Sequence, residues 1–218
     1  MKKQVLLGLV LATLTVVSIA TLFSESARSQ QGSRPDVVFD STSSNGGQWG
    51  SWTRTVFCPT GSYASGYTMR VEPSLGGGNN DDTALNAIRL YCRVPNGGRF
   101  TNGSDTVVIE AHPGFWGTWV EGRNCSPNRF MTTFNLRVER SLGGGLGSRD
   151  DTAANSVAFR CSSNQVIEAE GGPWGDWGSE IAGPPRSAIC GLAVKVEPQQ
   201  GGGDDTALND VSFYWCRR

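Results

Sequence analysis

The sequence has little charge and almost no histidine. Its 19 basic and 20 acidic side chains make up only 18% of 218 residues and leave a formal net charge of −1. Without a basic excess there is nothing to attract nucleic acid or anionic lipid, so neither is expected as a partner. His112 is the only histidine, which argues against a zinc site or a Cys-His nucleophile, and we expect no metal and no cofactor.

Sustained helical periodicity is also missing, whereas 29 glycines are spread along the chain. A sparsely charged, turn-rich composition of this kind favours a compact β protein over a helical or disordered one. The length suits one domain with a sizeable core.

The N-terminus has the features of an export signal. Two lysines precede an apolar run from Val5 to Phe23, and small residues suitable for cleavage follow. We therefore predict a signal peptide over residues 1–27 and a short tail over residues 28–34. The run of about 19 residues approaches the length that spans a bilayer, so an uncleaved anchor stays open as an alternative. No second apolar segment follows, and the mature chain is expected to be secreted, extracellular and monomeric, without membrane insertion.

Three blocks of the chain repeat one pattern, and such repetition decides the architecture before any local feature does. Each block carries Trp-Gly-x-Trp, an alternating segment that ends in Val-Glu, a glycine-rich loop, and Asp-Asp-Thr-Ala-x-Asn before a second apolar segment. Six of the seven tryptophans lie in these motifs, so the repeat does not arise from composition. The blocks cover about residues 35–99, 100–163 and 164–218 of a single predicted domain, 35–218.

The long segments of each block alternate apolar and polar residues with a period of two, which is typical of half-buried strands. Tyr67, Met69 and Val71, for example, share one side of such a segment. A short apolar segment and the residues after Trp-Gly-x-Trp bring the total to about four strands per block. A sheet with one apolar face cannot bury that face alone. We therefore predict an all-β fold in which each block forms a four-stranded sheet and the three sheets surround a shared axis as a prism.

Six cysteines, an even number, indicate an oxidising destination and three disulfides. In each of the first two blocks, one cysteine lies six residues after Trp-Gly-x-Trp and another closes the last strand. This spacing predicts the pairs Cys58–Cys92 and Cys125–Cys161, and most simply leaves Cys190 to pair with Cys216.

The third block departs from this pattern. Its two equivalent positions hold Gly183 and Trp215, so both members of the expected pair are missing together. In the alternation of its strand, Trp215 falls on the inward-facing side, and it is expected to fill the space of the missing disulfide. The same alternation places Cys216 on the opposite face, so the backbone needs a bulge near Gly191 or a frayed end for Cys216 to reach Cys190.

Together these motifs resemble the vitelline membrane outer layer protein I family. The resemblance rests on the threefold Trp-Gly-x-Trp, the Cys58-Pro59 pair, the Val-Glu strand ends, the Gly-Gly-Gly to Asp-Asp-Thr-Ala-x-Asn segments, and the run from Ala188 to Gly191. It covers about residues 35–218. It implies a β-prism of three Greek-key sheets with pseudo-threefold symmetry, secretion and, in animals, a place in the egg's outer vitelline layer. Members typically carry a fourth disulfide, which this chain lacks. Their architecture is similar to that of the β-prism lectins, which implies a glycan-related role without establishing it.

The acidic residues fall into two groups. Glu72, Glu139, Glu197 and three Asp-Asp pairs recur in every block, and a turn used three times explains them better than chemistry does, since Asp bonds nearby backbone amides. Calcium at an Asp pair stays an alternative, although the loops lack the spacing of a known calcium motif. Glycoside chemistry needs two carboxylates beside the scissile bond, and the candidates for it are acidic residues that break the symmetry: Glu110, Glu168, Glu170 and Glu180.

The tryptophans allow two interpretations. A buried Trp beside a glycine is common in a repeated core, and we expect this packing role. Alternatively, exposed rings stack on sugars, and Trp119, Asp176 and Trp177 are then the predicted glycan-binding residues.

These observations predict a secreted structural or interaction protein, of the extracellular matrix or cell-surface type, that binds extracellular glycans or matrix components and is not a catalyst. The alternative is a weak glycan-active enzyme that transfers sugars on N-acetylglucosamine oligosaccharides. A toxin-like role at membranes is a second rival, but the sequence supplies no insertion segment.

Overall fold

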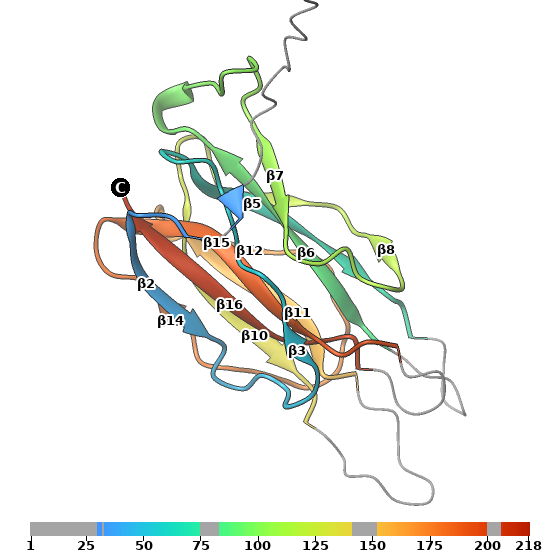
Figure 1. Ribbon diagram of the computed structural model, residues 1–218. Helices are drawn as coiled ribbons and strands as arrows, with labels where there is room; N and C mark the ends of the chain where they lie inside the picture. The colour runs from blue at the N-terminus through green and yellow to red at the C-terminus, as the bar shows by residue number, and fades with distance from the viewer. Residues whose placement is uncertain (1–29, 32, 75–82, 141–151, 200–205) are drawn as a thin grey trace, which may run out of the picture.

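The computed structural model describes residues 30–31, 33–74, 83–140, 152–199 and 206–218. The predicted signal peptide, the glycine-rich loops and the three Asp-Asp pairs lie outside these residues. The described part is almost entirely β-structure, with one short 3-10 turn, η1 (Pro95–Gly97), and the strands form three antiparallel sheets (Figure 1). Within the described residues, no helix has the length and hydrophobicity needed to cross a membrane.

Each sheet has four strand positions, and one edge position is filled by two short strands. Sheet A runs β2 (Val37–Thr42), β16 (Leu208–Arg217), β15 (Ser187–Val196), then the edge pieces β3 (Ser51–Trp52) and β4 (Val56–Phe57), with β1 (Gln30–Gln31) beyond β4. Sheet B runs β7 (Val107–Glu110), β6 (Leu85–Arg93), β5 (Tyr63–Val71), then β8 (Thr118–Trp119) and β9 (Arg123–Asn124). Sheet C runs β12 (Val166–Glu168), β11 (Ala154–Cys161), β10 (Met131–Val138), then β13 (Asp176–Trp177) and β14 (Ile181–Ala182).

This order confirms the predicted prism of three four-stranded Greek-key sheets. In sheets B and C, three strands follow one another through the chain and the fourth returns to lie beside the first, which is the Greek-key arrangement.

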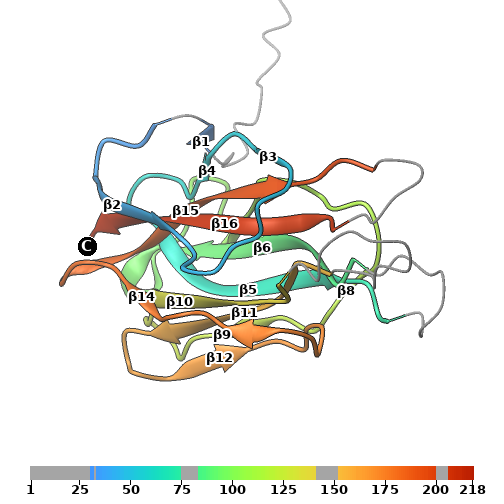
Figure 2. The ribbon, with the colours of Figure 1, turned by 90° about the horizontal axis from the view of Figure 1, so that it is seen from below.

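The prediction that each block forms its own sheet is wrong. Sheet B combines β5 and β6 of the first block with β7, β8 and β9 of the second, and sheet C combines the second block with the third in the same way. Sheet A closes the ring, because β15 and β16 of the third block pair with β2, β3 and β4 of the first (Figure 2). The alternation of a strand shows which face is apolar but not which strand lies beside it. The two ends of the chain therefore complete one sheet together.

The inward faces of all three sheets meet in one hydrophobic core. Edge-to-face aromatic contacts cross it, with ring centroids 4.7 Å apart between Phe134 and Phe213 and 5.1 Å apart between Phe159 and Phe213. The buried Tyr67 hydroxyl donates to the Val157 carbonyl at 2.7 Å and so ties sheet B to sheet C, and burial raises the pKa of that hydroxyl. These contacts hold the three sheets around a shared axis.

The cysteines form the disulfides Cys58–Cys92, Cys125–Cys161 and Cys190–Cys216. In the third block, Trp215 is fully buried in the main core and its indole Nε1 donates to the Thr132 carbonyl at 2.8 Å. A Cβ at Gly183 would overlap the Trp215 ring. The two residues are thus complementary in shape where the other blocks have a disulfide, as predicted.

The displaced disulfide lies in a second, smaller cluster of buried residues. The pairing of β15 with β16 shifts register between Ile189 and Gly191. Cys190 therefore occupies a bulge on β15, from which it bonds to Cys216 on the neighbouring strand β16. The predicted bulge near Gly191 is therefore confirmed.

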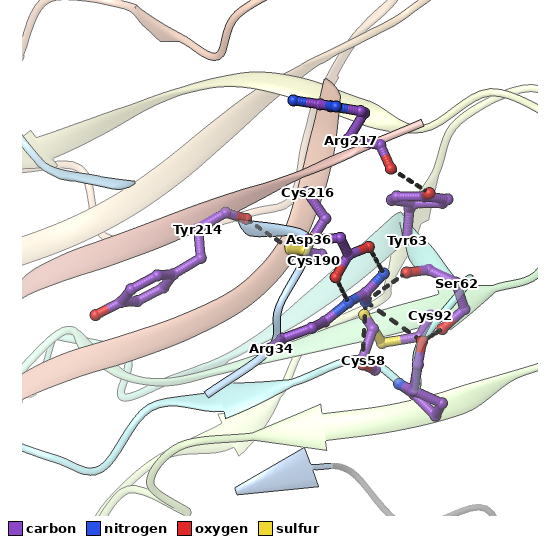
Figure 3. Close-up of a disulfide and its surroundings, with 11 residues drawn as sticks. Arg34, Asp36, Cys58, Ser62, Tyr63, Cys92, Cys190, Tyr214, Cys216 and Arg217 are labelled. Carbon is purple, nitrogen blue, oxygen red and sulfur yellow. Dashed lines mark hydrogen bonds and ion pairs between the residues drawn. A yellow bond between two sulfur atoms is a disulfide. The ribbon is translucent and has the colours of Figure 1, made fainter. Parts of the chain in front are cut away.

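The segment before β2 is anchored beside these disulfides (Figure 3). The Arg34 side chain is fully buried and donates to the carbonyls of Cys58 and Ser62 at 3.1 and 2.9 Å. Its Nε donates to the Asp36 carboxylate at 2.7 Å. This guanidinium, hydrogen bonded on several sides, fixes the N-terminal segment to the body of the protein.

Candidate functional site

The residues that recur in every block build a turn at one end of the sheets. In the first block, the Thr83 hydroxyl donates to Glu72 at 2.7 Å, and the Asn86 amide donates to the Thr83 hydroxyl at 2.6 Å. The same contacts occur in the other two blocks, through Glu139, Thr152 and Asn155 and through Glu197, Thr206 and Asn209. These three glutamates therefore support the turn, which is the structural role that the sequence predicts for them.

The glycine of Trp-Gly-x-Trp makes the close contact within that motif. Gly117 has a φ of 78°, and a Cβ there would overlap the backbone of Val71. Gly50 and Gly175 have the same conformation and the same contact with Val196 and Val138. Only glycine fits such a position without strain.

The flanking tryptophans consequently point away from the core, and the prediction that they are buried is wrong. The exposed fractions of Trp49, Trp52, Trp174 and Trp177 are 49%, 44%, 48% and 37%, whereas those in the second block are half-buried. The motif packs through its glycine and leaves its aromatic rings at the surface.

One hydrogen bond of the turn is present in two blocks and missing in the third. The Asn86 Oδ1 accepts from the Trp116 amide at 3.0 Å, and the Asn155 Oδ1 accepts from the Trp174 amide at 3.3 Å. The equivalent Oδ1 of Asn209 is fully buried and has no protein partner among the described residues. A buried acceptor of this kind calls for an unseen donor, either water or a ligand.

Asn209 lines a cleft of about 270 Å³ between sheets A and C. This volume is close to the lower end of the range for small-molecule sites, roughly 300–1,000 Å³. The cleft is lined by Asn45, Gly46, Gly47, Gln48 and Trp49 from the segment before β3, by Thr206 and Asn209 of sheet A, and by Val138, Glu139, Arg140 and Ala153 of sheet C.

Asn45 gives the cleft a second unpartnered acceptor. Its amide donates to the carbonyls of Leu136 and Asp176 at 3.3 and 3.2 Å, which fixes the side chain between the two sheets. Its Oδ1 is buried and, within the described chain, lacks a partner. The cleft thus has two amide oxygens without a hydrogen-bond donor in the described chain, and the exposed residue Trp49 is part of its lining.

The predicted glycan-binding residues lie at two separate places. Asp176 and Trp177 are on β13, and the Asp176 carbonyl contacts Asn45 at the cleft, although neither residue lines it. Trp119 lies on the outer face of sheet B, where the guanidinium of Arg89 stacks 3.7 Å from its ring centroid. One face of Trp119 is therefore covered.

The predicted catalytic carboxylates are distributed over the surface. Glu110 accepts from Arg89 at 2.6 Å on sheet B, and Glu180 is paired with Arg160. Glu168 lies on β12, at the edge of sheet C opposite to the edge that holds β14. Glu170 follows β12 and is exposed. Glu110 therefore lies in sheet B and Glu180 beside β14 of sheet C, whereas Glu168 and Glu170 are two residues apart in the chain.

The single histidine also has a local role. The Gly114 amide donates to the His112 Nδ1 at 3.0 Å, and burial lowers the pKa of His112. Across the part of the chain that the structure describes, no group of three or more His, Cys, Asp or Glu side chains is arranged to hold a metal ion.

Comparison with known proteins gives close relatives. The model of the vitelline membrane outer layer protein I family matches residues 39–218. The vitelline membrane outer layer protein 1 homolog of Homo sapiens is 42% identical over 173 residues, which cover 79% of this chain and 80% of that protein. The Mus musculus homolog is 41% identical over 172 residues, with the same coverage. Among solved structures, the Calystegia sepium agglutinin aligns with 84% of this chain and 99% of its own, at 14% identity and a TM-score of 0.48.

Proposed function

Since this chain belongs to the vitelline membrane outer layer protein I family, we propose that it is a secreted, non-catalytic structural protein that binds extracellular glycans in the cleft between sheets A and C. The observation that carries this proposal is the pair of unpartnered, buried amide oxygens of Asn45 and Asn209 beside the exposed ring of Trp49.

The chemistry of the cleft suits a sugar. Hydroxyl groups of a sugar are donors, and a small opening of the lining would let them donate to the two buried amide oxygens. The indole of Trp49 offers an apolar face against which the C–H face of a pyranose packs. Gln48 and Arg140 add donors on the lining for the sugar's own oxygens. The cleft therefore combines the apolar surface and the orienting polar groups that such sites need.

Other observations support secretion and a structural role. Three disulfides suit an oxidising compartment, in agreement with a signal peptide over residues 1–27. The three-sheet core and its three disulfides give a rigid scaffold, which suits a component of an extracellular layer.

The non-catalytic part of the proposal rests on the carboxylates. Glu110 and Glu180 are each neutralised by an arginine. The cleft contains one carboxylate, Glu139, which accepts a hydrogen bond from Thr152. Glycosyl transfer by an acid and a nucleophile needs two carboxylates at one bond, and the lining of this cleft offers one.

A matched pair of tryptophan variants tests the proposal. Trp49→Ala removes the ring at the cleft, whereas Trp174→Ala removes a ring of equal exposure at the same position of another block. A glycan array first identifies the ligand. We expect Trp49→Ala to weaken the binding of this glycan by about tenfold, as measured by calorimetry, and Trp174→Ala to leave its affinity unchanged.

Equal losses from both variants, or none from either, would contradict a site in the cleft. The same samples are incubated with chito-oligosaccharides and analysed by mass spectrometry. Product formation that depends on Glu110, Glu168, Glu170 or Glu180 would overturn the non-catalytic proposal.

A further inference from the structure

A second cavity lies at the opposite end of the sheets from the cleft. It also has a volume of about 270 Å³, and it is set among the end of β6, the turn after it and the loop before β10. Its lining consists of Ser65, Arg93, Val94, Gly97, Arg99, Asp105, Cys125, Ser126, Pro127, Asn128, Arg129 and Phe130.

Three arginines and one carboxylate give this cavity a local positive charge. Arg93, Arg99 and Arg129 face a single acidic lining residue, Asp105, in a chain whose formal net charge is −1. Elsewhere in the described chain, Arg34, Arg89, Arg123 and Arg160 each form an ion pair with a carboxylate. The arginines of the cavity form none within the residues that the structure describes.

These guanidinium groups keep most of their donors available. Arg93 donates through Nε to the Thr106 hydroxyl at 3.1 Å, and Arg99 donates through Nη1 to the Gly103 carbonyl at 3.2 Å. A guanidinium has five N–H donors, so each of these two has several left. The contacts to the loop also hold the two arginines in place.

The two serines of the lining already use their donors. The amide and the hydroxyl of Ser126 both donate to the Gln165 Oε1, at 3.0 and 2.9 Å, and the Ser65 hydroxyl donates to the Tyr91 carbonyl at 3.2 Å. The side-chain donors left for a ligand are those of Asn128 and of the arginines, whose planar fork matches the oxygens of a sulfate or carboxylate group.

We propose that this cavity binds an oxyanion carried by an acidic extracellular glycan, with a sulfate ester as the preferred group. The site is distinct from the cleft of the proposed function, and the proposal does not depend on that function. A protein with both sites would hold neutral and acidic parts of a matrix at opposite ends of one rigid prism.

Calorimetry with a heparin tetrasaccharide tests the site, with the desulfated and N-acetylated tetrasaccharide and a hyaluronan tetrasaccharide as comparisons. We expect the heparin fragment to bind, and its affinity to fall as salt increases. Tighter binding of the heparin fragment than of both comparisons, which keep carboxylates but carry no sulfate, supports the sulfate ester as the preferred group. Failure of the heparin fragment to bind, or equal binding of either comparison, overturns the proposal.

Variants locate the binding within the molecule. The triple change of Arg93, Arg99 and Arg129 to Gln should weaken heparin binding by at least about 30-fold. The single change Arg99→Gln should weaken it severalfold, whereas Arg54→Gln, a matched change at an exposed arginine outside the cavity, should not. Asp105→Asn should tighten binding. An equal loss from Arg54→Gln, or no response to Asp105→Asn and to the triple change, would contradict the site.

The two proposals fail independently in this design. Trp49→Ala should retain heparin binding, and the triple arginine variant should retain binding of a neutral glycan. Each variant is first compared with the parent protein by thermal unfolding, so that a loss of binding is read only from folded protein.

Discussion

Sheet A differs from sheets B and C in how the chain builds it. Sheets B and C are each formed by strands that follow one another in sequence, whereas sheet A joins β15 and β16 to strands from the other end of the chain. Three departures from threefold symmetry involve residues of β15 and β16 in this sheet. They are the replacement of a disulfide by Trp215 and Gly183, the displaced Cys190–Cys216 pair, and the unpartnered Oδ1 of Asn209.

This difference distinguishes the contacts that all three blocks share from the site that we propose. Features present in all three blocks, such as the contact of Glu72 with Thr83, stabilise the turns of the prism. Where sheet A meets sheet C, the repeated turn lacks one hydrogen bond and a cleft is present. This imperfect copy of the repeat is the place that we propose for glycan binding.

The largest expected effect concerns the residue that replaces a disulfide. Trp215→Ala removes a fully buried ring and leaves a cavity that Gly183, which has no side chain, cannot fill, so we expect the free energy of unfolding to fall by about 3–5 kcal/mol. Denaturant unfolding without reducing agent measures this value. Trp174→Ala, at an exposed position, is the control and should cost far less. Equal costs would show that Trp215 does not take over the packing of a disulfide.

The fold could be predicted from the sequence to the extent that it depends on local pattern. Alternation identifies the inward face of each strand, and the positions of Trp215 and Cys216 left a bulge near Gly191 or a frayed end as alternatives, of which the structure has the bulge. Pairing between blocks could not be predicted, because a strand of period two accepts either neighbour. The exposure of the tryptophans also escaped prediction, since it depends on the positive φ of the glycine between them.

The candidate site was only partly visible in the sequence. Asn45 precedes Gly-Gly and has the appearance of an ordinary turn residue, yet the other blocks have His112 and Glu170 at its position. That difference was the available signal. The missing partner of Asn209 could not be foreseen, because all three blocks have the same Asn, and the hydrogen bond depends on where the following loop places one amide.

A smaller effect on the free energy of unfolding is expected at the asparagine of the turn, where Asn209 of sheet A is compared with Asn155 of sheet C. Asn155→Ala removes the bond from the Trp174 amide as well as two bonds made by the side-chain amide, whereas Asn209→Ala removes only the latter kind. We expect Asn155→Ala to cost about 1 kcal/mol more in unfolding free energy, the worth of one hydrogen bond. Denaturant unfolding of both variants without added glycan gives the difference. A larger cost for Asn209→Ala would mean that its Oδ1 is already satisfied in the free protein.

The smallest expected effect concerns the pH dependence of the anchor on sheet A. The hydrogen bond and charge of Arg34 hold the pKa of Asp36 below its usual range, against the opposing effect of burial. A carboxylate with a lowered pKa stabilises the folded state above its unfolded pKa, and this contribution is lost as the pH falls through the folded pKa. The stability difference between the parent protein and Asp36→Asn should therefore be constant near neutral pH and shrink below about pH 4.

Asp210, whose pKa burial raises, gives the opposite sign, because its contribution to stability is present at low pH and lost as the pH rises through its folded pKa. Unfolding of Asp36→Asn and Asp210→Asn across this range measures both trends, and parallel curves for the parent and Asp36→Asn would show that the Arg34 contact does not contribute to closing sheet A.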